Sequence, residues 1–171
     1  MQHSAAASAL LTVTFTAAAA LTFGADVEKL SVFDTTNACK YCDLSGADFS
    51  GRSLQGADLE NANLAGASLR MADLSARPME KRIQPTNLRG ANLRGTDLSG
   101  ANLSNADMSR AYLRETNLAG ADLTNANLTN TNLRDADLSG ANLTGASMEG
   151  AKLETAKLCN TVMPDGVVKV C

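Results

Sequence analysis

The sequence predicts an all-β solenoid in which four segments of five residues close one square turn of the chain. An apolar side chain, usually Leu, returns every fifth residue from Leu44 to Leu74 and again from Leu88 to Met163, and a small residue almost always precedes it by two positions. Three related segments begin twenty residues apart: LRGTDL at residue 93, LRETNL at residue 113 and LRDADL at residue 133. Helices space apolar residues by three and four and half-buried strands by two, so a period of five requires a repeat architecture.

Within each five, the apolar centre and the small residue are expected to point inward, and the other three residues to face water. Each centre then lies about 4.8 Å from the centre twenty residues later, because neighbouring turns pair as strands do. Only 4% of the 171 residues are aromatic and none is Trp, so small and aliphatic side chains must fill this core. Arg52 occupies an inward position, and we expect its guanidinium to reach the rim or to find a partner.

The repeats are interrupted between Leu74 and Leu88, which are 14 residues apart. The intervening segment SARPMEKRIQP contains two prolines and four charges, which predicts a loop that leaves the coil over about residues 75–87. Met79 is an alternative centre; if it points inward, the array completes six full turns and Arg70 joins the wall that carries Arg94.

The two flanks differ from the repeats. Residues 4–25 carry no charge and are followed by DVEK, which predicts a secretory signal peptide over residues 1–25, with a retained N-terminal membrane anchor as the alternative. Residues 26–41 begin with DVEKLSVF, whose apolar residues have helical spacing, so a short helix is expected to cap the first turn. The repeats themselves extend over residues 42–163, and residues 164–171 form a C-terminal cap.

The chain has four cysteines, Cys39 and Cys42 before the repeats and Cys159 and Cys171 at their end. An even number in an exported chain predicts disulfides. A four-cysteine zinc site would require the two ends of a rigid solenoid to meet, and a thioredoxin-like redox pair requires a βαβ unit that is not predicted here. Two local bridges, Cys39 to Cys42 and Cys159 to Cys171, are therefore favoured.

The sequence argues against an enzyme. The single histidine, His3, lies in the predicted signal peptide, so the mature chain lacks the commonest general base and metal ligand. Aspartates are plentiful, but each occupies the outward polar position of a repeat, where they are expected to solubilise the surface and to hydrogen-bond turns. Such residues are Asp58, Asp73, Asp97, Asp107, Asp122 and Asp137. We therefore expect no catalytic residue, no cofactor and no metal.

The A-[DN]-L-x-x pattern resembles the pentapeptide-repeat family over about residues 42–163. The resemblance implies a right-handed quadrilateral β-helix. The segments CKYCDL at 39–44 and LCNTVMPDG at 158–166 are similar to the flanks of exported or thylakoid-lumenal members. These segments imply an exported protein, in the periplasm or in the thylakoid lumen of a cyanobacterium, without stable membrane insertion after the signal is cleaved.

Two functions follow from the resemblance. The first is a structural or protein-interaction scaffold that offers its walls to a protein or an envelope component. The alternative is a DNA-mimicking, gyrase-binding protein of the quinolone-resistance type, which requires a strongly acidic face and a cytoplasmic location. The formal net charge of only −3 and the predicted leader favour the scaffold. Nucleic acid is not an expected partner.

Three arginines recur directly after stacked leucines, namely Arg94, Arg114 and Arg134. At a spacing of twenty they should form a vertical ladder on one wall, where like charges about 5 Å apart repel. Glu115, Asp135 and Glu154 are placed to neutralise the ladder through surface ion pairs. The second hypothesis is that the arginines contact an anionic partner.

Overall fold

The structure is a computed structural model, and it describes Phe33, residues 36–79 and residues 82–171. The predicted signal peptide and most of the predicted cap helix lie outside the described residues. In the part of the chain that is described, there is no helix with the length and the hydropathy that crossing a bilayer requires.

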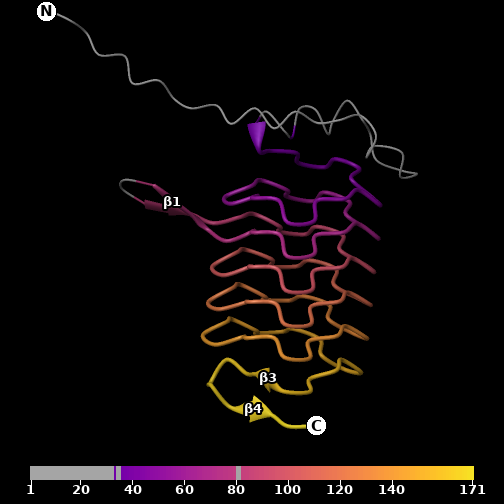
Figure 1. Cartoon of the computed structure of the whole chain (residues 1–171), viewed down its shortest axis with the longest axis vertical. Helices are drawn as coiled ribbons and strands as arrows, with labels where there is room; N and C mark the ends of the chain where they lie inside the picture. Colours follow the sequence, from indigo (N-terminus) through magenta and orange to yellow (C-terminus); the bar gives the residue numbers. More distant parts are fainter. Residues whose placement is uncertain (1–32, 34–35, 80–81) are drawn as a thin grey trace, which may run out of the picture.

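The described chain winds into one stack of coils (Figure 1). Successive coils are joined by parallel bridges between residues twenty apart, such as Asp43 with Asn63 and Asn92 with Tyr112. Each coil contains four such bridge positions, one for each five, so twenty residues close a turn as the sequence predicts. The fold is therefore an all-β solenoid in which most pairs are single bridges rather than long strands.

The apolar centres fill the interior of this stack. Leu93, Leu113 and Leu133 are each 0% exposed and lie on successive coils. Threonines in the small-residue position are also buried, and their hydroxyls donate to backbone carbonyls: Thr116 Oγ1 lies 2.7 Å from the carbonyl oxygen of Leu93. The core therefore contains hydroxyl groups whose hydrogen bonds are satisfied.

Each corner of the coil is a tight turn. The carbonyl of the centre accepts the N–H three residues later, as between Leu103 and Ala106 at 3.1 Å. The residue before that N–H has a positive φ, for example 58° at Asn105 and 64° at Gly100. This is the geometry of a type II turn, and it explains why Gly and Asn dominate this position of the repeat.

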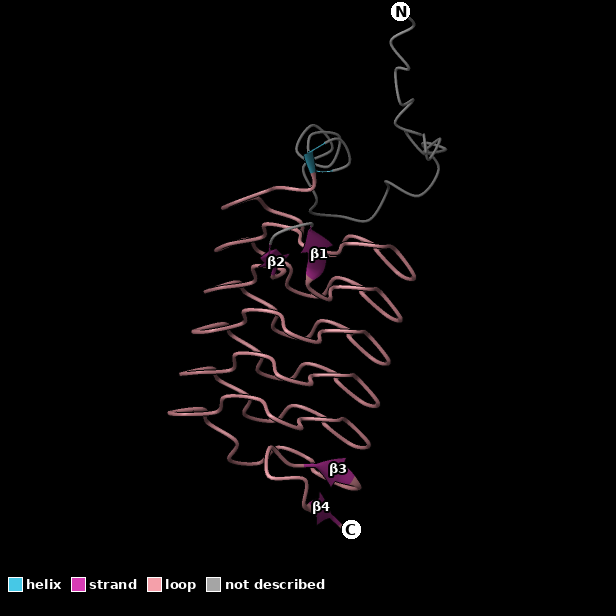
Figure 2. Ribbon diagram, turned by 90° about the vertical axis from the view of Figure 1, so that its left-hand side faces the viewer, coloured by secondary structure: helices cyan, strands magenta, loops and turns pink. Residues whose placement is uncertain are grey.

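The segment predicted to be a loop contains a hairpin. Strand β1 (Arg77–Met79) pairs antiparallel with β2 (Arg82–Gln84), and the hairpin projects sideways from the stack (Figures 1 and 2). Coils flanking it pair residues 29 apart, such as Asp58 with Asn87, so nine residues leave the coil there. Met79 lies in β1 and is 50% exposed, so it is not an additional centre.

The root of the hairpin is held firmly by the coil. Thr86 takes the small-residue position after the interruption, and its hydroxyl lies 2.9 Å from the carbonyl oxygen of Ser75 and 2.8 Å from the amide nitrogen of Gly56. The side-chain amide of Gln84 donates to the carbonyl of Gly56 at 3.1 Å. A Cβ at Gly56 would lie 2.8 Å from the Cβ of Arg77, so the root requires glycine there.

Aromatic side chains close the N-terminal end of the core. Phe33 is 2% exposed and packs edge-to-face on Phe49, with ring centroids 5.7 Å apart. The guanidinium carbon of Arg52 lies 5.6 Å from the centroid of the Phe49 ring. The inward arginine therefore has an aromatic partner, through a cation–π contact.

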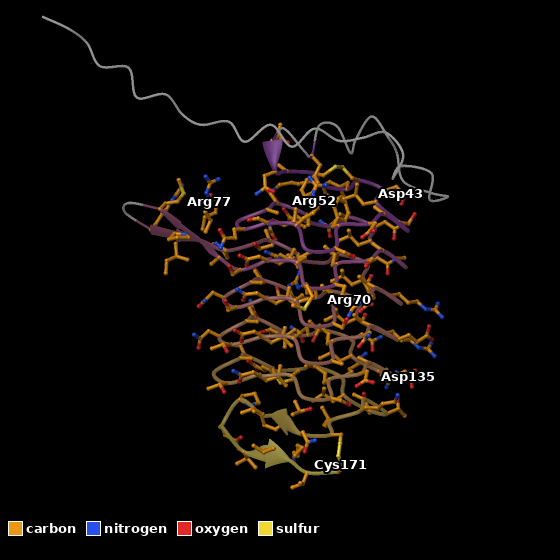
Figure 3. All side chains as sticks on the ribbon, in the orientation of Figure 1. Asp43, Arg52, Arg70, Arg77, Asp135 and Cys171 are labelled. Carbon is orange, nitrogen blue, oxygen red and sulfur yellow. A yellow bond between two sulfur atoms is a disulfide. The ribbon has the colours of Figure 1, made fainter. Side chains whose placement is uncertain are left out.

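At the other end, β3 (Thr161–Val162) pairs antiparallel with β4 (Val168–Lys169). The cysteines are joined locally at both ends of the stack: Cys39 to Cys42 with Cα atoms 5.5 Å apart, and Cys159 to Cys171 with Cα atoms 4.7 Å apart. Figure 3 shows the second bridge below the last coil. This is the pairing that the sequence favours.

Candidate interaction surface

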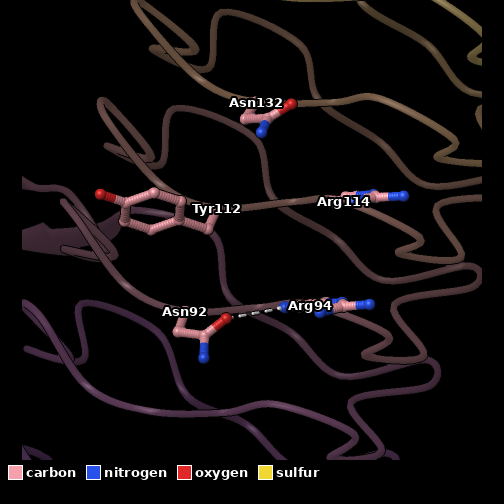
Figure 4. Close-up of a pocket in the computed structure, with 5 residues that line it drawn as sticks. All are labelled: Asn92, Arg94, Tyr112, Arg114 and Asn132. Carbon is pink, nitrogen blue, oxygen red and sulfur yellow. Dashed lines mark hydrogen bonds between the residues drawn. The ribbon is translucent and has the colours of Figure 1, made fainter.

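One wall of the coil carries two parallel columns of outward side chains, and we call it the arginine wall (Figure 4). The first column contains Asn92, Tyr112 and Asn132, which are bridged on successive coils. The second contains Arg94, Arg114 and Arg134, each two residues further along the chain. Residues two apart on an extended segment share a face, so each coil presents one side chain from each column.

The arginines of this wall are neutralised within the chain. Arg94 forms a two-pronged pair with Glu115, its Nε and Nη2 each 3.2 Å from a carboxylate oxygen. The Nε of Arg114 lies between Glu115 at 3.3 Å and Asp135 at 3.1 Å, and Arg134 pairs with Glu154 at 3.3 Å. All are largely exposed, so each pair contributes little to stability.

Arg70 does not belong to this wall. Its neighbour Ser68 bridges Asp97, so Arg70 lies over the wall of Asp97 and Ser99. Figure 3 shows its side chain on the coil, away from the hairpin that carries Arg77. The possibility that depended on Met79 as a centre is therefore wrong, because Met79 is outside the coil.

Tyr112 interrupts the polar column of the arginine wall. In most repeats the Oδ1 of Asn or Asp accepts the backbone N–H two residues later, as Asn92 does from Arg94 at 3.2 Å. The same oxygen often accepts an amide N–H from the next coil, as Asn63 does from Asn92 at 3.0 Å. A tyrosine ring provides neither bond, and 57% of this side chain is exposed.

A shallow pocket of about 350 Å³ lies around the tyrosine. It is lined by Asn92, Arg94, Tyr112, Arg114 and Asn132. In Figure 4 the ring lies between the two asparagines, and both guanidinium groups lie on the same side of it. The pocket therefore combines an aromatic surface with cationic and amide donors.

The outward aspartates have structural hydrogen bonds. The Oδ1 of Asp97 accepts the N–H of Ser99 at 3.0 Å and the side-chain amide of Asn117 at 3.1 Å. Asp107 and Asp122 accept equivalent backbone bonds. Within residues 33, 36–79 and 82–171, no three His, Cys, Asp or Glu side chains are grouped so that they could hold a metal ion.

Below about pH 4, acidification is expected to lower the melting temperature of the coil. The pKa of Asp137 lies below its ordinary value of 3.8, mainly because the hydroxyl of Ser139 donates to its carboxylate. A hydroxyl from Thr155 likewise lowers the pKa of Asp135, assisted by Arg114. A carboxylate with a lowered folded-state pKa stabilises the fold fully above its unfolded pKa, and this stability is lost as pH falls through the folded pKa.

Thermal unfolding at pH 7, 5 and 3 tests this dependence. The melting temperature should be similar at the first two values and lower at the third. Asp137→Asn should reduce the drop, and an equal drop in that variant would contradict the assignment to this carboxylate.

Sequence reasoning missed two features of the surface. The repeat interruption predicts only a loop where the structure has the hairpin, and the residues predicted to form a contact do not include Tyr112. The segment AYL at 111–113 did contain a signal, since it places a large aromatic ring where the repeat otherwise favours Asn or Asp.

The coil of fives, its turns and its side-chain ladders define a pentapeptide-repeat protein. A family model described as pentapeptide repeats matches residues 42–76, 86–125 and 121–160, with eight copies. These segments cover more than half of the chain, which therefore belongs to the pentapeptide-repeat family. No curated protein sequence matches it.

Three solved structures of similar proteins are compared, and the first two, with TM-scores above 0.5, agree with this fold. The pentapeptide repeat protein Rfr23 of the cyanobacterium Cyanothece 51142 is 29% identical, with a TM-score of 0.67 over 80% of this chain and 98% of that one. QnrB1, a plasmid-mediated fluoroquinolone resistance protein, is 23% identical, with a TM-score of 0.52 over 71% and 62%. HetL of Nostoc sp. strain PCC 7120, involved in the regulation of heterocyst differentiation, is 34% identical, with a TM-score of 0.43 over 77% and 66%.

Proposed function

We propose that this protein is a non-catalytic, exported scaffold that binds another protein or an envelope component, and that the β1–β2 hairpin is its main contact element. The coil is proposed to be a right-handed, four-sided β-helix, as in the family, with a helical cap within residues 26–41. The observation that carries the proposal is the hairpin. The coils pair in register on both sides of it, so the coil does not need the hairpin to continue its own pairing.

The hairpin has the composition of a contact surface. All six described residues of β1 and β2 are exposed, including Met79 at 50% and Ile83 at 66%. Arg77 and Met79 alternate with Pro78, so apolar side chains lie on both faces of the ribbon. Exposed aliphatic side chains next to arginine are typical of interfaces.

Photo-crosslinking tests the hairpin as the contact element. A photoreactive amino acid at Ile83 of the full chain should capture a partner in the envelope fraction. The same amino acid at Thr144, exposed on the coil near the other end, serves as the control. Equal capture at both positions would contradict the proposal.

Export is supported by the uncharged leader and by the two disulfides, which persist in oxidising compartments. Blocking free thiols in intact cells before extraction should leave all four cysteines unmodified. Four free thiols would contradict export and would favour the alternative, a cytoplasmic protein that binds gyrase. Inhibition of gyrase supercoiling by the purified chain would support that alternative directly.

The arginine wall is proposed as a second contact, toward an anionic partner. Replacing Arg94, Arg114 and Arg134 by Gln is expected to reduce the free energy of unfolding by less than about 1 kcal/mol for each exposed pair. At low salt, the triple variant should bind an anionic partner more weakly than the unchanged chain does. This difference in affinity should shrink as added salt screens the charges. Arg70→Gln, on the neighbouring wall, is the matched control. Unchanged partner binding in the triple variant would leave the ladder only a structural role.

A further inference from the structure

We infer that Tyr112 and Arg114 form a binding site for a small planar ligand that carries a carboxylate or phosphate group. The site is the shallow pocket of about 350 Å³ on the arginine wall. This inference is independent of the hairpin contact, since the hairpin lies outside the residues that line the pocket, and it shares Arg94 and Arg114 with the proposed anionic contact of the arginine wall.

Tyr112 is unfavourable for the coil. At this position Asn or Asp would accept two hydrogen bonds, as Asp97 does from Ser99 and Asn117. Tyrosine instead exposes 57% of its side chain and gives no acceptor to the neighbouring coil. Natural sequences break their own local pattern mainly where function requires it.

Because tyrosine occupies this position, hydrogen-bond donors next to it remain available. Among the described hydrogen bonds, neither the backbone N–H of Arg114 nor the side-chain amide of Asn132 has an acceptor, whereas the backbone N–H of Arg94 donates to Asn92 and the side-chain amide of Asn117 donates to Asp97. Arg114 uses only its Nε for Glu115 and Asp135, so its terminal amino groups remain available. In Figure 4 the tyrosine ring points to one side of the wall and the side chains of Arg94 and Arg114 point to the other, so the pocket lies between an aromatic group and donors that suit an anionic oxygen.

The ring and the charges together define the ligand class. An exposed tyrosine face stacks planar groups, which is worth about 1–3 kcal/mol for a base on an aromatic side chain. The ladder as a whole is neutral, because Glu115, Asp135 and Glu154 accompany the three arginines. A long polyanion would meet all of these carboxylates, so the wall is better suited to a small ligand with one anionic group.

Calorimetric titration of the full chain tests the inference with matched probes. Adenosine monophosphate and indole-3-carboxylate both join a planar ring to an anionic group. Adenosine, indole and inorganic phosphate each lack one of the two features and should bind at least about tenfold more weakly. If only the nucleotide binds, the anionic group is a phosphate; if only indole-3-carboxylate binds, it is a carboxylate. Equal binding of adenosine and its monophosphate would overturn the anionic requirement.

Nuclear magnetic resonance locates the ligand. The chain has only two tyrosines, so the Tyr41→Phe variant with labelled tyrosine rings reports Tyr112 alone. Binding should move the ring signals in the direction that stacking produces. Binding without any shift of these signals would overturn the site.

Two variants separate a binding role from a structural one. Tyr112→Asn should abolish binding and raise the melting temperature by a few degrees, because the side-chain ladder is restored. Arg114→Gln should weaken binding about tenfold, while Arg70→Gln should not change it. A lower melting temperature in Tyr112→Asn, or undiminished binding in it, would refute the inference.

Discussion

Deleting residues 77–85 together with Ala76→Gly is expected to give a coil that melts at or above the temperature of the full chain but no longer binds the partner. The deletion removes the nine residues by which the bridge spacing exceeds twenty, and it joins Leu74 to Leu88 in the register of an ordinary five. The Ala76→Gly change supplies the positive φ of the corner. A shorter connection also closes with a smaller loss of entropy.

A deletion of ten residues, 76–85, is the matched control for this experiment. It leaves the corner one residue short, so the centres at Leu74 and Leu88 cannot both point inward. Its melting temperature should be much lower than that of the nine-residue deletion. If both deletions unfold the coil, the hairpin is part of its stability rather than a separate contact element.

The period of the sequence predicts the fold because only one arrangement of the chain buries every apolar centre. A residue such as Leu113 must be buried, and only four segments of five residues bring the next coil into register beneath it. The local disulfides follow from the same geometry, since the rod separates its two ends. The local sequence pattern and the long-range pairing agree at every coil, so a single sequence is sufficient to predict the fold.

The contact surface is less predictable because the repeat does not constrain it. Nothing in the coil determines whether the nine inserted residues form a loop or a hairpin. Pairing of Arg77 with Gln84 depends on the anchors at Gly56 and Thr86, which come from different coils. Likewise, the donors beside Tyr112 are available only because Asn132 lies on the adjacent coil, an arrangement that requires the exact stacking of the wall.

The second large effect is expected in the core. Leu113→Ala should reduce the free energy of unfolding by about 2–5 kcal/mol, because the side chain is 0% exposed and its loss leaves a cavity. Leu93 and Leu133, on the adjacent coils, contribute to the packing around it. The interior is narrow and each coil is stabilised mainly by its neighbours, so few other side chains can move to fill the space.

Leu113→Met and Leu153→Ala are the controls for this measurement. Met108 already occupies a centre with 0% exposure, so methionine at 113 should cost less than about 1.5 kcal/mol. Leu153 is only partly buried in the last coil, so the same truncation there should have a smaller effect than at Leu113. Urea denaturation of the three variants gives the comparison. If Leu113→Ala were no more destabilising than Leu153→Ala, the stack of buried centres would not be the main source of stability in the middle of the coil.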